Sequence, residues 1–150
     1  MSYLLDTNIL LRLLVPEHPM NSDAVKVIDS LRSTGKKLII ASQNLIELWN
    51  VCTRPLEKNG LGLTSSETKQ EIEQLKTLFV FLPDTAEIYQ ECERLVTTYN
   101  VKGVNVHDTR LIAFMLIHSI DHLLTFNTKD FQRFSNEIFI VHPQKTFSPS

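Results

Sequence analysis

The sequence predicts an α/β fold, a mainly parallel five-stranded sheet flanked by helices, in one domain that spans residues 1–150. Short apolar runs alternate with longer segments of helical periodicity, which is the pattern of βαβ units. The first run, residues 3–5, ends at Asp6. Ligands bind beyond the carboxyl ends of strands in such sheets, so Asp6 stands where chemistry is expected. The alternative interpretation is that Asp6 or Thr7 only caps the helix that follows.

Composition and charge exclude several classes of protein. The 150 residues are 43% hydrophobic, which suits a single core, and a net charge of −2 argues against a protein that coats nucleic acid non-specifically. Cys52 and Cys92 match no metal-ligand spacing and indicate reduced thiols. With no basic leader and no apolar run of membrane length, we expect a cytoplasmic protein that does not enter a membrane.

Two helices and the second strand are predicted next along the chain. Residues 8–15 are apolar around one arginine and end at Pro16, which cannot continue a helix. Residues 20–31 carry apolar side chains at helical spacing, and Gly35 follows as a stop signal. Residues 38–41 form a continuous apolar run, which is typical of a buried parallel strand.

The next helix is one that Ser42 can cap, and it extends to about Thr53. Its apolar stripe at positions i, i+3, i+4 and i+7 consists of Leu45, Leu48, Trp49 and Cys52. Glu47 lies off this stripe. Taken alone, Glu47 is therefore interpreted as a solvated helix glutamate.

A capping box at residues 64–67 predicts a helix as far as Leu78. Residues 79–82 are the third predicted strand, and residues 84–87 repeat the capping pattern and open a helix that reaches Tyr99. We therefore expect a strand between two capped helices in this part of the chain.

Residues 105–108 predict the start of another helix, whose residues 111–117 are apolar on nearly every face. Such a helix is buried. Asp108 lies in its first turn, where a carboxylate suits the helix dipole even without a further role. The last two strands are predicted at residues 122–126 and 138–141.

Polar side chains gather at the ends of these predicted strands and at the start of the buried helix. They are Asp6, Glu47, Asp108, Asn127 and Asp130. Carboxylates that share a crevice raise one another's pKa values, and a divalent cation offsets that repulsion. Oxygen ligands without a Cys/His cluster favour Mg²⁺ or Mn²⁺, and this chemistry suits the hydrolysis of phosphodiester bonds.

Four short strings carry a resemblance to a known family. They are Leu5-Asp6-Thr7-Asn8, residues 42–47, residues 106–111 and residues 125–131. In this order and at these spacings they resemble the successive motifs of the PIN domain, over nearly the whole length of the chain. More narrowly, the chain resembles VapC-type ribonucleases, the toxin half of VapBC toxin–antitoxin pairs.

This resemblance implies a PIN-like fold and a Mg²⁺- or Mn²⁺-dependent endoribonuclease in which Asp6, Glu47 and Asp108 bind the metal. Asn127 stands where family members often have a fourth acid, and Asp130 lies three residues further on. The resemblance also implies a homodimer and, as partner, a small VapB-type antitoxin whose C-terminal segment covers the acidic groove. By the same analogy, hydroxyl groups that hold carboxylates or water come from Thr7, Ser42 and Thr125.

Three alternatives remain open. One is a PIN-domain nuclease of RNA processing without a toxin role, and another is a PIN-fold RNA-binding module that has lost catalysis, against which the intact acids count. The third is a phosphatase with an aspartate nucleophile, but Asn8 stands where such enzymes have their second aspartate. RNA phosphates need cationic partners, and among the basic residues near the motifs we expect Arg54 and Lys58 to matter most.

Overall fold

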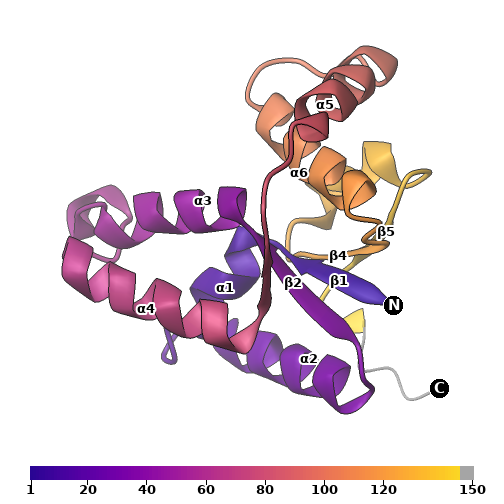
Figure 1. The fold of residues 1–150 in the computed structure, drawn as a ribbon. Coiled ribbons are helices and arrows are strands. Elements are labelled where there is room, and N and C mark those ends of the chain that lie inside the picture. Colours follow the sequence, from indigo (N-terminus) through magenta and orange to yellow (C-terminus); the bar gives the residue numbers. More distant parts are fainter. Residues whose placement is uncertain (146–150) are drawn as a thin grey trace.

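A sheet of parallel strands forms the centre of the computed structural model, which describes residues 1–145 (Figure 1). The strands are β1 (Ser2–Leu5), β2 (Lys37–Ala41), β3 (Val80–Leu82), β4 (His122–Leu124) and β5 (Phe139–Val141). Every pairing is parallel, and the order across the sheet is β3-β2-β1-β4-β5. The predicted five-stranded α/β fold is therefore confirmed.

Helices connect the strands largely as the periodicity predicts. They are α1 (Thr7–Leu13), α2 (Asn21–Ser33), α3 (Ser42–Thr53), α4 (Ser65–Leu78), α5 (Glu87–Thr98) and α6 (Asn105–Ile117), with the 3₁₀ segments η1 (Leu56–Lys58) and η2 (Thr128–Phe134). The fourth strand is shorter than the predicted 122–126. The strand ends at Leu124, and the backbone N–H of Phe126 donates to the side chain of Asn8, at 3.3 Å.

Side chains of the strands alternate between two apolar cores, one on each face of the sheet. On β1, Leu4 joins the core under α5, α6 and η2, whereas Tyr3 and Leu5 join the core under α1 to α4. This alternation is expected of a strand that is covered on both faces. The ribbon has the same division, with α5 and α6 on one side of the sheet and α1 to α4 on the other (Figure 1).

Two predicted helix caps are wrong. Ser42 is the first residue of α3, and the backbone N–H of the preceding Ala41 donates to the side chain of Asn44, at 2.9 Å. Asp84 does not cap α5, which begins at Glu87 without a side-chain cap. The Ser42 hydroxyl donates instead to the Asp84 carboxylate. Because β2 and β3 are parallel neighbours, the residues that follow their carboxyl ends lie close together, and there the Ser42 hydroxyl and the Asp84 carboxylate form this hydrogen bond.

The strand order reverses direction at β1, because the chain first moves outward to β2 and β3 and then returns to β4 on the other side. Such a switch point leaves a crevice beyond the carboxyl ends of the two strands, where α/β proteins bind ligands. Asp6 follows β1 and Asn127 lies three residues beyond β4, so both lie at this crevice. Within residues 1–145, no helix is both long and apolar enough to cross a membrane.

Candidate active site

A hollow at this crevice, which we call the acidic cleft, collects side chains from four parts of the chain. Its walls come from the start of α1, from α3, from the first turn of α6 and from the β4–η2 region. They are Asp6, Thr7, Asn8, Leu11, Glu47, Asp108, Asn127, Asp130 and Phe131. The structure thus brings together all five polar residues that the sequence places around the strand ends. Their roles in catalysis stay predictions.

Asp6 is the buried acid of the acidic cleft, with 8% of its surface exposed. One carboxylate oxygen accepts the backbone N–H of Thr7 at 2.8 Å, and the other accepts the hydroxyl of Thr125 at 2.7 Å. The pKa of Asp6 is raised to about 6, first by burial and then by the nearby charges of Glu47 and Asp108, and the two hydrogen bonds act in the opposite direction. Asp6 is also the N-cap of α1, so the two interpretations of this residue are compatible.

Glu47 approaches the acidic cleft from the solvent side. It is exposed on α3, as the periodicity predicts, yet its Oε2 accepts the hydroxyl of Thr7 at 3.1 Å. Its Oε1 accepts the side-chain amide of Gln43 at 3.2 Å. Because α3 follows β2 without a loop, its exposed face passes the edge of the sheet. An exposed position and a position in the cleft are therefore consistent.

Asp108 is half-buried in the first turn of α6. The pKa of Asp108 is raised to about 6, first by burial and then by the nearby carboxylates of Asp130 and Glu47, while His107 and Arg133 act in the opposite direction. The raised pKa values of Asp6 and Asp108 have the same physical cause. Each carboxylate has lost water and lies near other carboxylates.

Asn127 and Asp130 enter the acidic cleft at the start of η2, and both are exposed. The backbone N–H of Asn127 donates to the Thr125 hydroxyl oxygen at 2.9 Å, and the backbone N–H of Asp130 donates to the Asn127 carbonyl at 3.1 Å. This turn aims Asp130 at the Asp108 side of the cleft. Asn127 contributes an amide there, and Asp130 contributes a further negative charge.

Two of the three predicted hydroxyl groups support carboxylates of the cleft. Thr125, which is fully buried, donates to Asp6, and Thr7 donates to Glu47. The third, Ser42, donates outside the acidic cleft, to Asp84. Ser42 therefore holds a carboxylate, as the resemblance implies, but this carboxylate does not line the acidic cleft.

Two supporting asparagines were not identified from the sequence. Asn44 is fully buried, and its amide nitrogen donates to the hydroxyl oxygen of Thr7 at 3.4 Å. The amide nitrogen of Asn8 donates to the hydroxyl oxygen of Thr125 at 3.3 Å. The available signal was position, since each asparagine lies in the first turn of a helix that directly follows a buried strand.

A wider hollow, which we call the side chamber, adjoins the acidic cleft and shares Glu47, Asp108 and Asp130 with it. Its lining residues are Gln43, Ile46, Glu47, Asn50, Asp84, Val104, Asn105, His107, Asp108, Arg110 and Asp130. Among these lining residues, Arg110 is the one that carries a guanidinium. Arg54 and Lys58, the predicted partners of RNA phosphates, line neither hollow, so the geometry does not favour that prediction.

The acidic cleft is short of positive charge. None of its lining residues is Lys, Arg or His, and none of its four carboxylates forms an ion pair with another described residue. Among residues 1–145, no three His, Cys, Asp or Glu side chains are arranged to enclose a metal ion as they stand. The donor set nevertheless fits a hard divalent cation, because it consists of carboxylate, amide and hydroxyl oxygens without competing cations.

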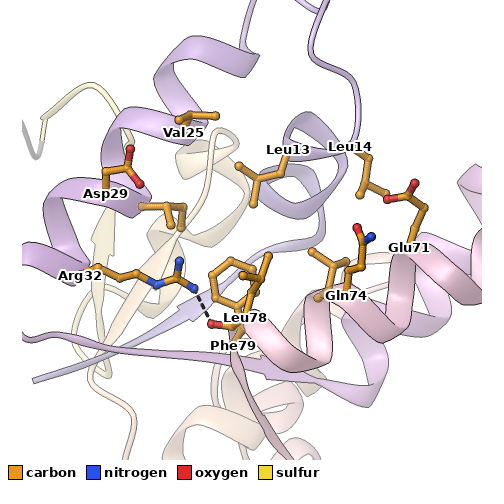
Figure 2. A pocket seen from close by; sticks show the side chains of 11 residues that line it. Leu13, Leu14, Val25, Asp29, Arg32, Glu71, Gln74, Leu78 and Phe79 are labelled. Atoms are coloured by element: carbon orange, nitrogen blue, oxygen red, sulfur yellow. Dashed lines mark hydrogen bonds between the residues drawn. The ribbon is translucent and has the colours of Figure 1, made fainter.

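A third hollow lies between α1, α2 and α4, and we call it the apolar groove (Figure 2). Its lining residues are Leu13, Leu14, Val25, Ile28, Asp29, Arg32, Glu71, Gln74, Leu75, Leu78 and Phe79. Arg32 crosses one end, where its guanidinium donates to the carbonyl of Leu78 and lies 5.1 Å from the ring centre of Phe79. The groove is thus an apolar surface with charged groups at its rim.

Comparison with known proteins identifies the fold. Residues 3–137 match the PIN domain family. A search of curated proteins finds no significant match. Among solved structures, a chain of the VapBC2 complex of Rickettsia felis, crystallised with a promoter DNA fragment, matches with TM-score 0.70 and 16% identity over 95% of this chain and 98% of that chain.

Two further structures agree with this match. For VapBC-1 from nontypeable Haemophilus influenzae the TM-score is 0.69 and the identity 21%, over 96% of this chain and 99% of that chain. For VapC20 of Mycobacterium tuberculosis, a toxin that cleaves the sarcin–ricin loop, the TM-score is 0.63 and the identity 14%, over 91% of this chain and 96% of that chain. At these identities the matches show a shared fold. Because the family match spans most of the sequence, this chain belongs to the PIN domain family.

Proposed function

We propose that this protein is an endoribonuclease that depends on Mg²⁺ or Mn²⁺ and acts as the toxin of a type II toxin–antitoxin pair. The observation that carries the proposal is the acidic cleft, where Asp6, Glu47 and Asp108 converge from three separate elements without a basic partner among the described residues. PIN-domain nucleases generally use divalent metal ions. Asp6, Glu47 and Asp108 are the proposed ligands here.

The raised pKa values support a cation in this cleft. An unpaired, buried carboxylate costs free energy when it ionises, and a divalent cation would remove that cost for Asp6 and Asp108 together. Such an ion would supply a lowered pKa for a nucleophilic water and positive charge near the scissile phosphate. Mg²⁺ retains several waters and needs few protein carboxylates directly, so Asp6, Glu47 and Asp108 need not all contact the ion.

The surrounding residues orient this donor set. Thr125 fixes one oxygen of Asp6 and Thr7 fixes one oxygen of Glu47, so each carboxylate presents its other lone pairs to the cleft. Asp130 approaches Asp108. Its proposed role is to accept a proton during the reaction or a hydrogen bond from a water molecule. Asn127 replaces a carboxylate with an amide, so its proposed role is to donate a hydrogen bond to substrate.

The proposed activity is tested by cleavage of RNA with and without Mg²⁺ or Mn²⁺. Asp6→Asn, Glu47→Gln and Asp108→Asn should each reduce cleavage by about 100-fold or more, because each removes charge from the site. Glu17→Gln is the matched control, since Glu17 is an exposed loop carboxylate outside the acidic cleft. A wild-type chain that binds RNA without cleaving it, with either metal, would indicate a non-catalytic binding module.

The apolar groove supports the proposal of a protein partner. The matched structures from Rickettsia felis and Haemophilus influenzae are VapBC complexes, and a structure from Klebsiella pneumoniae is a toxin–antitoxin complex. A groove lined by leucines between helices suits the apolar face of a partner helix. If the partner's chain continued from the groove along α1, it would reach the acidic cleft at the other end of this short helix. We propose that a small antitoxin binds in this way.

Expression in a bacterial host tests the toxin role. The wild-type chain alone should arrest growth, and Asp6→Asn should relieve the arrest. A short antitoxin-like protein, encoded beside this chain, should restore growth and co-purify with it. A folded, RNA-cleaving chain that is harmless without any partner would instead support a nuclease of RNA processing. Sedimentation analysis of the purified chain tests the further expectation of a homodimer.

A further inference from the structure

We propose that Gln43 and Arg110 form a positioning relay that holds the Glu47 carboxylate in the acidic cleft. The relay runs from Asp84, which follows β3, through Arg110 on α6 to Gln43 and Glu47 on α3. It rests on the proposed function, in which Glu47 binds the metal ion. Gln43 and Arg110 lie inside the strings at residues 42–47 and 106–111, and the relay gives them a role that the resemblance does not assign.

Glu47 needs support because it is an exposed side chain on a helix. A free glutamate side chain populates many rotamers, and holding it in one position costs entropy. The structure holds both of its oxygens, Oε2 by the Thr7 hydroxyl at 3.1 Å and Oε1 by the Gln43 amide at 3.2 Å. Thr7 belongs to the first motif string, and Gln43 belongs to the second, one turn before Glu47 on the same helix.

The orientation of the Gln43 amide follows from its three neighbours. Arg110 Nη1 donates to Gln43 Oε1 at 3.0 Å, and a guanidinium has donors only. The amide nitrogen therefore faces the other way, toward the His107 carbonyl at 2.7 Å and Glu47 Oε1 at 3.2 Å. Both of these atoms are acceptors. All three contacts thus agree on one orientation, and the flipped amide would oppose like groups at each of them.

Arg110 is itself held away from the cleft acids. Its Nη2 lies 3.3 Å from Asp84 Oδ1, and the other oxygen of Asp84 accepts the Ser42 hydroxyl. Arg110 lines the side chamber together with Glu47, Asp108 and Asp130, so a free guanidinium would find unpaired carboxylates nearby. Asp84 offers it a different partner. The relay therefore keeps a cation at the rim of the side chamber and passes only a neutral amide to Glu47.

The first test observes the Gln43 side-chain amide by NMR in the metal-free, ¹⁵N-labelled protein. Its proton resonances should be displaced from those of a free glutamine, and Glu47→Gln and Arg110→Met should each move them. Gln90 is the internal control, because it is exposed on α5 and does not belong to the relay. Gln43 resonances that match those of Gln90 and ignore both substitutions would overturn the relay.

The second test measures Mn²⁺ binding by calorimetric titration. Gln43→Met keeps the side-chain volume and should weaken binding by about tenfold, a typical loss for a group that orients a metal ligand. In a Glu47→Gln background the same substitution should add nothing, and Arg110→Met should add nothing to Gln43→Met. Gln90→Met should match wild type. Additive losses would mean that these residues act separately, which contradicts a relay.

Folding and activity respond separately to these substitutions. The contacts of Gln43 with Glu47 and His107 are exposed and its contact with Arg110 is only part-buried, so the variants should melt close to wild type. Arg110→Lys is a second variant that retains charge but cannot serve Asp84 and Gln43 together, so it should move the Gln43 resonances as Arg110→Met does. The NMR test requires neither metal nor RNA. A chain with the displaced Gln43 resonances but without Mn²⁺ binding or RNA cleavage would refute the proposed function and leave the relay intact.

Discussion

The acidic cleft and the apolar groove lie at opposite ends of α1 and have opposite chemistry. Asp6, Thr7 and Leu11 face the cleft, whereas Leu13 and Leu14 face the groove. At 1.5 Å per residue, the helix that separates them is only about 10 Å long. One short helix therefore borders both the proposed site of chemistry and the proposed site of its control.

Both regions cost the isolated protein free energy, but by different means. The acidic cleft keeps carboxylates unpaired and partly dehydrated, as the raised pKa values of Asp6 and Asp108 indicate. The apolar groove leaves hydrophobic side chains in water, with Leu78 53% exposed and Val25 39% exposed. Under the proposed function, a cation would relieve the cost in the cleft and an apolar partner would relieve the cost in the groove. Substitutions should therefore separate the two regions.

The largest expected effect is such a separation of cleavage from partner binding. Val25→Glu places a charge in the apolar groove and should weaken antitoxin binding by about 30-fold or more, the loss expected at an interface hot spot. Its RNA cleavage should equal that of wild type. Asp108→Asn should do the reverse, with cleavage lost and binding retained. Affinity and cleavage measured on both variants decide the matter.

Lys26→Glu on α2 is the control for Val25→Glu, because Lys26 is exposed and does not line the groove. Full antitoxin affinity in Val25→Glu would place the partner elsewhere. Equal loss of cleavage in Val25→Glu and Asp108→Asn would mean that the two regions are not independent.

The next effect concerns pH and applies to the cleft alone. The folded pKa of Asp6, about 6, lies above its ordinary value of 3.8. Its ionisation therefore destabilises the fold progressively as pH rises from about 4 to above 6, whereas Asn has no such cost. In EDTA, the stability of Asp6→Asn relative to wild type should rise by about 2–3 kcal/mol between pH 4 and pH 7.5.

Urea unfolding at a series of pH values measures this difference. Mn²⁺ should reverse it at pH 7.5, because the cation stabilises only the chain that retains the carboxylate. A difference between the two chains that does not change with pH would mean that Asp6 is not destabilised by burial.

The same contrast explains what could be predicted from the sequence. Apolar periodicity predicts the parallel sheet and its covering helices, because burial on both faces dictates it, and the strand-end rule places Asp6 and Asn127 at the crevice. Glu47 is different. Its helix periodicity indicates only solvent exposure, and the residue is placed in the cleft by the geometry of the β2–α3 junction. Its position after the second strand and the resemblance to family motifs pointed to it, whereas the helix periodicity did not.

Features that depend on contacts between distant parts of the chain could not be predicted. Ser42 and Asp84 have the local pattern of helix caps, yet their side chains contact each other across neighbouring strands. The apolar groove likewise combines α1, α2 and α4, whose relative positions no local pattern contains. Local patterns thus predict elements, whereas side-chain partners depend on the tertiary arrangement.

A smaller effect is expected at Thr125, whose hydroxyl joins three groups of the cleft. It donates to Asp6 and accepts from the Asn127 backbone and the Asn8 amide. Thr125→Val keeps the shape and should destabilise the protein by about 1–2 kcal/mol at pH 7.5. This loss of stability should be smaller at pH 4, where Asp6 is protonated. Independently, Thr125→Val should reduce RNA cleavage by about tenfold.

Thr68→Val on α4 is the matched control for Thr125→Val. Thr68 is also fully buried, but its hydroxyl donates only along its own helix, to the Thr64 carbonyl at 2.9 Å. This control should leave cleavage unchanged and should show no change of its effect with pH. Unaltered cleavage in Thr125→Val would remove Thr125 from the proposed support of the site.

The smallest effect is expected at Arg32, at one end of the apolar groove (Figure 2). Its guanidinium donates to the carbonyl of Leu78, the last residue of α4, and lies over the ring of Phe79. A cation at a helix C-terminus and over an aromatic ring is favourable, but Arg32 is exposed, so water weakens both terms. Arg32→Met should therefore lower the stability by only about 0.5–1 kcal/mol.

The substitution should matter more for the partner than for the fold. Arg32 connects α2 to the end of α4, and its loss removes this polar contact between two walls of the apolar groove. Antitoxin affinity should fall while cleavage stays at the wild-type level. Lys26→Met, on the same helix and outside the groove, should change neither quantity. If Arg32→Met lowered cleavage, the apolar groove would be coupled to the acidic cleft through α1, and the independence of the two regions would be disproved.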